Sequence, residues 1–204
     1  MCRHQLPVWQ EFYAAHRAEG FEILSVSVDA LGPSVVRPWT ERAHAGFTTV
    51  VDQENMLAAA FGFKAVPNGL LVDPNGTLRF KQFGGFDIRK AENRAQVESF
   101  ITQSFASVDA TLPQSIQAAT ANADESWQTH FQTGVRWLES GHPREAALEL
   151  RQALLLDPSN YLVRKQLWRT LHPDKFGEQI DLQWQKEQIE RETQVGYEQA
   201  NPVE

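Results

Sequence analysis

Apolar residues recur at helical spacing between residues 4 and 19, where Leu6, Trp9 and Phe12 fall on one side. A continuous apolar and β-branched run then covers residues 21–28. Runs of this kind are typical of a strand that is buried on both faces of a parallel sheet. The pattern therefore predicts a helix followed by a central strand.

The same reasoning predicts the rest of the N-terminal half. Expected helices cover about residues 34–45, 55–61 and 89–105, and expected strands cover 47–51, 70–73 and 77–83. Pro74-Asn75-Gly76, between the last two strands, is a strong hairpin signal. Strands that alternate with helices and end in a hairpin indicate an α/β fold with an antiparallel edge.

Composition divides the chain into a first domain, a linker and a helical part. Residues 106–123 are rich in Ser, Ala, Thr, Gln and Asn, which predicts a linker, and the pattern beyond them is all helical. We therefore expect a first domain over residues 1–105, a helical segment over 124–195 and a flexible tail over 196–204.

The helical segment carries the spacing of one tetratricopeptide repeat. The matching residues are Gly134, Trp137, Gly141, Ala146, Leu150, Ala153 and Pro158. Small residues at 134 and 146 allow two antiparallel helices to approach closely. One repeat cannot bury its own face. It must pack on a third helix predicted over residues 159–170, on the first domain or on another chain, and a charged helix is predicted over 181–193.

Composition and charge exclude several classes of function. The 204-residue chain carries a formal charge of −7 without a basic stripe, which argues against nucleic acid as the main partner. No apolar run is long enough to cross a bilayer. The single cysteine excludes an intrachain disulfide or a cysteine-based metal cluster, and the histidines lack metal-site spacing, so we expect no metal or cofactor. No leader is visible, and the compartment stays open.

That cysteine, Cys2, directly precedes the first predicted helix. A thiol at a helix N-terminus faces unpaired backbone N–H groups and the positive end of the helix dipole, which favour the nucleophilic thiolate. The alternative is a small hydrophobic residue at a frayed helix end. His4 could tune the thiolate, but we favour an ordinary solvent-facing role for it.

Three further features accompany Cys2: Pro7 five places on, the predicted strand at 21–28, and Val66-Pro67 just before a strand. Together they resemble the thioredoxin-like superfamily, in particular the ResA/TlpA-like thiol–disulfide oxidoreductases and the AhpC/TSA peroxiredoxins. The resemblance covers roughly residues 1–105 and implies a three-layer α/β/α domain. Cys2 and Pro7 match the second half of the family motif Cys-x-x-Cys-x₄-Pro, and Val66-Pro67 matches the segment with the cis-proline.

The resemblance implies three alternative functions. In a thiol–disulfide oxidoreductase, Cys2 would resolve a mixed disulfide with a protein substrate, and a cis Pro67 would leave the Val66 backbone free to pair with that substrate. In a peroxiredoxin, Cys2 would be the peroxidatic thiolate and Arg79 would stabilise it and the peroxide, although we favour an outward-facing strand role for Arg79. The third alternative is a non-enzymatic scaffold whose tetratricopeptide-like helices bind a protein partner or self-associate.

Asp29 and Asp52 end predicted strands, where α/β sheets present ligands. Aspartate also caps the helix that follows, and we favour capping for both.

The resemblance further implies a strand that this sequence lacks. The family's first cysteine and the strand before it would lie upstream of Met1, and that strand would run between the strands at 21–28 and 70–73. The sheet must then close up, borrow a strand from another chain, or belong to a longer natural protein. We expect the last, an N-terminally truncated form of an ordinary redoxin. Direct pairing of the two strands would instead favour the scaffold.

Overall fold

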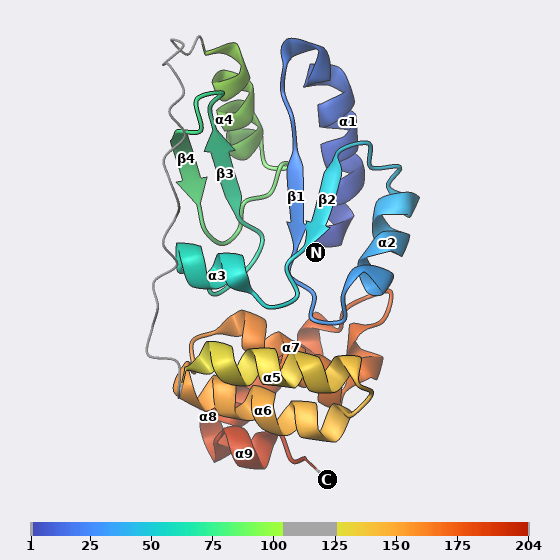
Figure 1. The fold of residues 1–204 in the computed structure, drawn as a ribbon, viewed down its shortest axis with the longest axis vertical. Helices are drawn as coiled ribbons and strands as arrows, with labels where there is room; N and C mark the ends of the chain where they lie inside the picture. Colours follow the sequence, from blue (N-terminus) through green and yellow to red (C-terminus); the bar gives the residue numbers. More distant parts are fainter. Residues whose placement is uncertain (1, 104–125, 204) are drawn as a thin grey trace. The chain divides into compact units, whose positions relative to one another are not determined.

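A computed structural model of the chain describes residues 2–103 and 126–203 (Figure 1). The described residues divide into two compact units that share the N-terminal half of the sequence. The first unit contains residues 2–27, 33–50 and 65–103, and the second contains residues 28–32, 51–64 and 126–203. The expected linker at 106–123 lies outside the described residues.

The first helix agrees with its prediction and starts at the cysteine. A 3₁₀ turn, η1 (Cys2–Gln5), runs directly into α1 (Leu6–His16), and a second 3₁₀ turn, η2 (Arg17–Glu19), follows. Pro7 lies in the first turn of α1, where a missing N–H group costs no helical hydrogen bond. Cys2 is therefore the first residue of a continuous helical run.

The other elements of the N-terminal half follow the predicted order. They are β1 (Leu24–Ser27), α2 (Pro33–Arg42), β2 (Thr48–Val51), α3 (Met56–Phe61), β3 (Gly69–Val72), β4 (Leu78–Gln82) and α4 (Ala91–Thr102). The predicted hairpin is confirmed, because β3 and β4 pair antiparallel with Leu71 opposite Phe80. Its turn is closed by the Asp73 N–H, which donates to the Thr77 carbonyl at 2.9 Å.

The central strand differs from its prediction. The run at 21–28 was expected to be buried on both faces, but β1 is shorter and Leu24 is 65% exposed. Among the described residues, β1 pairs only with β2 and β3 only with β4, in two separate two-stranded sheets. The expected direct neighbour of β1 on its other side is absent from these sheets, which explains the exposure.

The core of the first unit lies between α1, the β3–β4 hairpin and α4. Its buried residues are Phe12, Leu71, Phe86, Ile88 and Val97, with Val8, Trp9, Phe21, Phe80, Phe100 and Ile101 packed around them. No described residue of β1 or β2 belongs to this cluster. The β3–β4 hairpin, and not the β1–β2 sheet, thus packs with α1 and α4 in this core.

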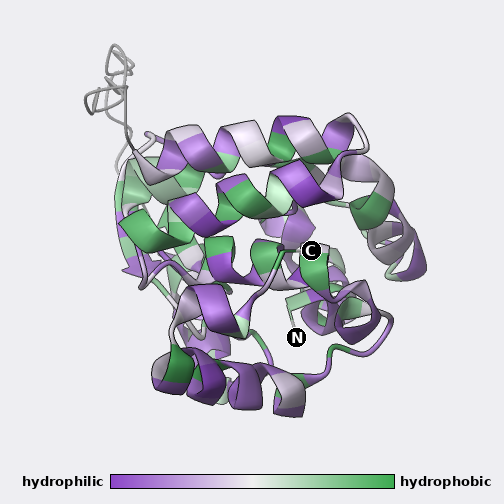
Figure 2. Ribbon diagram, turned by 90° about the horizontal axis from the view of Figure 1, so that it is seen from below, coloured by the Kyte–Doolittle hydropathy of each residue, from purple (hydrophilic) through white to green (hydrophobic). Residues whose placement is uncertain are grey.

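The second unit is mainly helical. Its further helices are α5 (Trp127–Glu139), α6 (Pro143–Leu156), α7 (Tyr161–Leu171), η3 (Pro173–Phe176), α8 (Leu182–Val195) and α9 (Tyr197–Ala200). Hydrophobic and hydrophilic segments alternate along these helices (Figure 2). The apolar faces of α5, α6 and α7 meet in one core that includes Phe131, Leu150 and Leu167, together with Ala30 from the loop after β1.

Helices α5 and α6 approach closely at Gly134. A Cβ atom there would lie 3.1 Å from the Leu150 Cγ and 3.3 Å from the Ala146 carbonyl oxygen. Distances this short are tighter than most real Cβ contacts, so the helix pair depends on the absence of a side chain.

We expect Gly134→Val to lower the free energy of unfolding by about 1–3 kcal/mol through overpacking. Urea unfolding followed by circular dichroism measures the change. Arg136→Val, at an exposed position of the same helix, is the matched control for the poorer helix propensity of valine. Equal losses in the two variants would mean that the close approach at Gly134 contributes nothing.

The segment expected as a flexible tail over 196–204 contains a short helix in the part that the structure describes, residues 196–203. Gly196 has a φ of +83°, and this left-handed backbone leads directly into the short helix α9. Ala200 and Asn201 are then buried, and the Asn201 side-chain amide donates to Glu192 at 3.0 Å. The sequence signal missed this because the segment is polar, and its polar groups are satisfied by buried partners on α8.

Candidate functional site

Cys2 is exposed at the start of the helical run. Partial burial, and then the positive charges of Arg3 and Arg89, hold the pKa of the neighbouring His4 below its ordinary value. His4 itself is exposed, as favoured from the sequence. Arg3 and Arg89 thus place positive charge near this helix start, and nearby positive charge favours a thiolate over a thiol.

Two guanidinium groups gather on one indole beside this helix start. The Arg3 Cζ lies 3.9 Å from the centre of the Trp39 ring, and the Arg42 Cζ lies 4.8 Å from it. Cation–π contacts of this kind hold arginine side chains in place. Because Arg3 directly follows Cys2, a fixed positive charge lies next to the thiol in the chain.

The Val66–Pro67 peptide bond is cis, which confirms the prediction. The segment that carries it is tied to the turn after β4. The Phe86 N–H donates to the Pro67 carbonyl at 3.2 Å, and the Gly84 N–H donates to the Asn68 side-chain oxygen at 2.7 Å. The proline segment is thus fixed by the loop that leads from β4 to α4.

The same loop is also fixed to the start of the first helix. The Ile88 N–H donates to the buried side-chain oxygen of Gln5 at 3.2 Å. The ring of Phe86 stacks on Trp9, with ring centres 6.2 Å apart. We call residues 84–88 the bridging loop, because it contacts both the Pro67 segment and the helix that begins at Cys2.

Sequence reasoning missed the bridging loop. Gly69 offers the one signal that could have revealed it, since glycine inside a strand often marks a close approach by another group. A Cβ atom at Gly69 would lie 2.4 Å from the ring of Phe86. Gln5 carried no signal of its structural role, because a glutamine in a first helical turn is usually exposed.

Arg79 lies on β4, where its Nε donates to the buried carboxylate of Asp73 at 2.6 Å. Burial alone would raise the pKa of Asp73, but hydrogen bonds from the Thr77 N–H and from Arg79 outweigh it and hold that pKa below its ordinary value. Arg79 therefore stabilises the hairpin turn. Its role beside a thiolate stays a hypothesis of the peroxiredoxin alternative.

The two strand-ending aspartates differ in role. Asp52 caps α3 as favoured from the sequence, because its carboxylate accepts from the Met56 and Leu57 N–H groups at 2.9 and 2.8 Å. Asp29 instead accepts from the Leu31 N–H and pairs with Arg169 of α7. Neither carboxylate shows a ligand-binding arrangement in these contacts.

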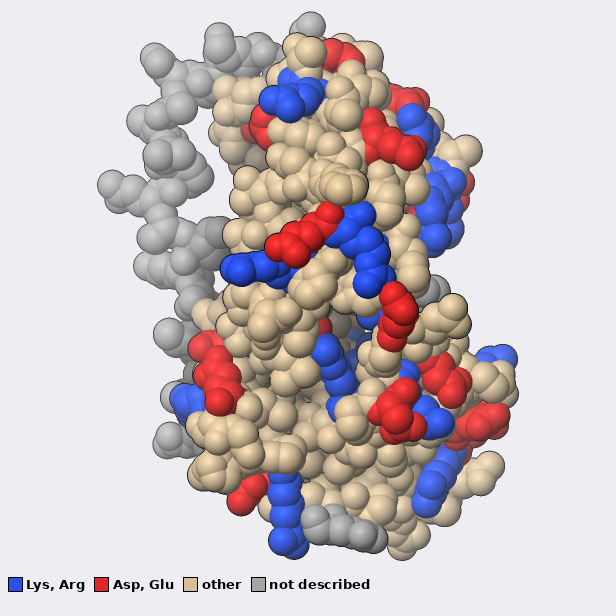
Figure 3. Space-filling view, turned by 90° about the vertical axis from the view of Figure 1, so that its right-hand side faces the viewer, with Lys and Arg blue, Asp and Glu red and all other residues tan. Residues whose placement is uncertain are grey.

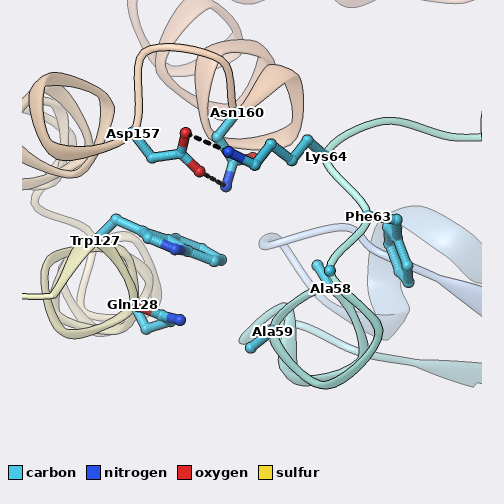
Figure 4. A pocket seen from close by; sticks show the side chains of 9 residues that line it. Ala58, Ala59, Phe63, Lys64, Trp127, Gln128, Asp157 and Asn160 are labelled. Atoms are coloured by element: carbon cyan, nitrogen blue, oxygen red, sulfur yellow. Dashed lines mark hydrogen bonds and ion pairs between the residues drawn. The ribbon is translucent and has the colours of Figure 1, made fainter. Parts of the chain in front are cut away.

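A small cavity lies within the second unit (Figure 4). It has a volume of about 90 Å³, and Trp127, Lys64 and Asp157 are among the residues that line it. The Lys64 ammonium donates to the Asp157 carboxylate and to the Ser159 hydroxyl, each at 2.8 Å. Burial opposes the ionisation of Asp157, but the hydrogen bonds from Lys64 and Ser159 outweigh it, so its pKa is lowered. The pair fastens the segment after α3 to the α6–α7 turn.

The surface and the remaining side-chain clusters offer few further candidates for a functional site. On the face drawn in Figure 3, basic and acidic side chains are interspersed. Within the described ranges, no group of three or more His, Cys, Asp or Glu side chains could hold a metal ion. Of the helices that the structure describes, none combines the length and apolar character needed to cross a membrane.

Comparison with known proteins addresses the N-terminal half. The AhpC/TSA family model matches residues 1–81. Two curated proteins named thiol-disulfide oxidoreductase ResA, from Geobacillus thermodenitrificans (strain NG80-2) and Geobacillus kaustophilus (strain HTA426), are 30% identical over 79 and 78 residues. Residues 1–81 are thus similar to the thioredoxin-like redoxins, and we call them the redoxin segment. It includes both Cys2 and the cis bond before Pro67.

The match has defined limits. Each alignment covers 38% of this chain and 44% of the relative, so the chain spans less than half the length of the curated relatives it matches. No solved structure matches the chain significantly. The redoxin segment extends into β4, and the helices from α5 onward lie beyond the matched residues.

Proposed function

We propose that the redoxin segment carries out thiol–disulfide exchange through Cys2. The observation that carries the proposal is the bridging loop. It binds the Pro67 carbonyl through the Phe86 N–H and the Gln5 side chain through the Ile88 N–H. A solvent-exposed thiol at a helix start and a cis-proline segment are thereby held in one unit. The names of the two curated relatives, thiol-disulfide oxidoreductases, support the same chemistry.

In the proposed reaction, a second thiol that is not part of this sequence first attacks the substrate disulfide, forms a mixed disulfide with one substrate sulfur, and releases the other as a thiolate. The Cys2 thiolate then resolves the mixed disulfide by attacking the sulfur of that second thiol. A new S–S bond forms between Cys2 and that sulfur, the mixed S–S bond breaks, and the leaving substrate thiolate takes up a proton from solvent. The positive charge of Arg3 and the helix start stabilise the attacking thiolate. As the family resemblance implies, the Val66 backbone would pair with an extended segment of a protein substrate.

We expect Cys2 to react with a chromogenic aromatic disulfide at pH 7 about tenfold faster than a free cysteine does. Half of the maximal rate should be reached below pH ~8.5, the midpoint for an ordinary thiol. The same chain unfolded in urea is the matched control, because it keeps the thiol and loses the helix. Equal rates in the folded and unfolded chains would contradict the proposal, because the fold would then not activate Cys2. The Cys2→Ser variant measures the background rate of the assay.

A second assay separates the exchange from a peroxidase. Arg79→Gln should leave the disulfide reaction of Cys2 unchanged, because Arg79 is engaged with Asp73 in the hairpin turn. Arg94→Gln is the matched control, since Arg94 also pairs with a carboxylate on the surface of the first unit. Fast oxidation of Cys2 by hydrogen peroxide that is lost only in Arg79→Gln would favour the peroxiredoxin alternative.

We also infer that α5 and α6 form a tetratricopeptide-like hairpin that holds a protein partner. The close approach at Gly134 supports the hairpin. On the outer side of α5, Trp137 is 38% exposed beside a hollow that Thr133, Arg136 and Ser140 help to line. If a protein partner binds the Trp137→Ala variant with unchanged affinity, the face of α5 around Trp137 does not take part in binding.

A further inference from the structure

Two arginine side chains from different elements meet on one indole ring beside Cys2. Arg3 belongs to η1, whereas Arg42 ends α2, the helix that also carries Trp39. Their Cζ atoms lie 3.9 and 4.8 Å from the centre of the Trp39 ring. Residues three apart on a helix are neighbours, so local geometry places Arg42 at Trp39, while Arg3 reaches the same ring across the fold. We call Arg3, Trp39 and Arg42 the arginine–indole cluster.

The cluster gathers positive charge in a chain whose formal charge is −7. Two other basic groups near the helix start contribute less. Partial burial above all, and then nearby positive charges, hold the pKa of His4 below its ordinary value, so this ring is largely neutral at pH 7. The charge of Arg89 is balanced by the carboxylate of Asp87, which accepts from its Nη2 at 2.6 Å. Recognition by charge at this place would therefore depend on Arg3 and Arg42.

Two like charges held on one ring favour a bound anion. The two guanidinium groups repel each other, and a protein surface screens this repulsion less than bulk water does. A carboxylate placed near both is attracted by each of them and can accept paired N–H donors. Each guanidinium carries five N–H donors in a fixed plane, so a carboxylate can be added to the contacts that these side chains already make. Stacking on the indole restricts both groups before the anion arrives.

We propose that the arginine–indole cluster binds carboxylate groups that flank the cysteine of a disulfide substrate. The inference rests on the proposed exchange at Cys2 and names its substrate class, which is disulfides in acidic peptide segments. An extended chain advances about 3.5 Å per residue, so a carboxylate one or two positions from the substrate cysteine can reach Arg3, which directly follows Cys2. Glu41 precedes Arg42 on α2, but adjacent residues of a helix do not face each other.

The test measures the charge selectivity of Cys2 toward small disulfides. The probes are three blocked peptides, X-X-Cys-X-X with X as Glu, Gln or Lys, whose cysteine carries a 2-thiopyridyl group. The Cys2 thiolate attacks the peptide sulfur, a Cys2–peptide disulfide forms, and the displaced pyridinethiolate takes up a proton and is followed by its absorbance. Each rate is divided by the rate of the same peptide with the chain unfolded in urea, which removes differences in the reactivity of the peptides themselves.

We expect the normalised rate of the Glu peptide to exceed that of the Lys peptide at least tenfold in dilute buffer. Salt at about 0.5 M should reduce this ratio, because it screens exposed charges. Arg42→Gln should lower the ratio at least threefold. The matched control is Arg37→Gln, which should leave the ratio unchanged, because Arg37 is exposed on the same helix but lies two residues from Trp39 and does not face it.

Two ring variants examine the indole itself, with circular dichroism to verify that each chain is folded. Trp39→Leu should lower the ratio as Arg42→Gln does, and Trp39→Phe, which keeps an aromatic face, should restore most of it.

Equal normalised rates for the Glu and Lys peptides would overturn the proposed carboxylate site. Equal losses in Arg42→Gln and Arg37→Gln would overturn it too, because overall charge alone would then explain the selectivity. A Glu preference in a folded chain that reacts no faster than the unfolded one would support the carboxylate site and contradict the exchange function. The two proposals therefore fail through different results.

Discussion

Trp168→Ala is expected to lower the free energy of unfolding of the second unit by about 3–5 kcal/mol, the usual cost of removing a large buried aromatic side chain. Trp168 is fully buried on α7. It packs edge-on against Tyr161 and Trp184, with ring centres 6.0 and 5.6 Å away. Its loss would leave a cavity between α7 and α8 that neighbouring rings fill only partly.

The indole of Trp168 also belongs to a buried polar network. Its Nε1–H donates at 2.7 Å to Glu192, whose side chain is almost fully buried and also pairs with Arg164 at 2.9 Å. Trp168→Phe keeps most of the packing and removes this donor. We therefore expect it to cost about 1–3 kcal/mol, the penalty for a buried acceptor that loses a partner.

Urea unfolding followed by circular dichroism at 222 nm measures both Trp168 variants, with the second unit's transition fitted separately. Trp137→Ala is the matched control, because Trp137 lies in the same unit but is 38% exposed. It should cost clearly less than Trp168→Ala. Similar losses for the two would show that burial in this core does not set the stability of the unit.

This network also shows what the sequence could and could not predict about the helices. The apolar spacing placed a third helix over 159–170 with Trp168 on it, and α7 occupies that place. The spacing could not show that the charged helix α8 buries Glu192, because a single glutamate in a charged helix is usually exposed. Only the partners from α7 and the chain end make its burial possible.

In the first unit, short sequence motifs predicted local structure correctly, whereas the sequence pattern did not predict contacts between distant residues. The hairpin turn and the cis bond at Pro67 were predicted from short motifs, the second through the family resemblance. The pattern at 21–28 predicted a strand buried on both faces, but burial requires neighbours that the pattern cannot supply. The bridging loop joins Gln5 to Ile88, a contact across most of the domain that residue spacing does not encode.

The bridging loop leads to the second large effect, which is expected for Gly69→Ala. A Cβ atom there would lie 2.4 Å from the nearest atom of the Phe86 ring. It would also lie 2.6 Å from Cγ, the ring atom that is bonded to the Cβ of Phe86. The ring cannot turn aside easily, because Phe86 is buried and stacked on Trp9. We expect a loss of about 1–3 kcal/mol in the free energy of unfolding of the first unit, as for other overpacked cores.

A displacement of Phe86 by the new Cβ atom should also affect the proposed site at Cys2 and Pro67. If Phe86 moves, its N–H no longer holds the Pro67 carbonyl, and Ile88 no longer holds Gln5 at the helix start. Hydrogen exchange at the Phe86 and Ile88 amides should then quicken at least tenfold, and the disulfide reaction of Cys2 should slow. Gly46→Ala is the matched control in the same unit, because a Cβ atom there meets only the Gln10 side chain, at an ordinary 3.6 Å. A Gly69→Ala chain that is destabilised but keeps the Cys2 rate would separate the fold of the loop from the reactivity of the thiol. Since exchange chemistry is proposed to depend on this loop, that outcome would count against the loop as the support of the site.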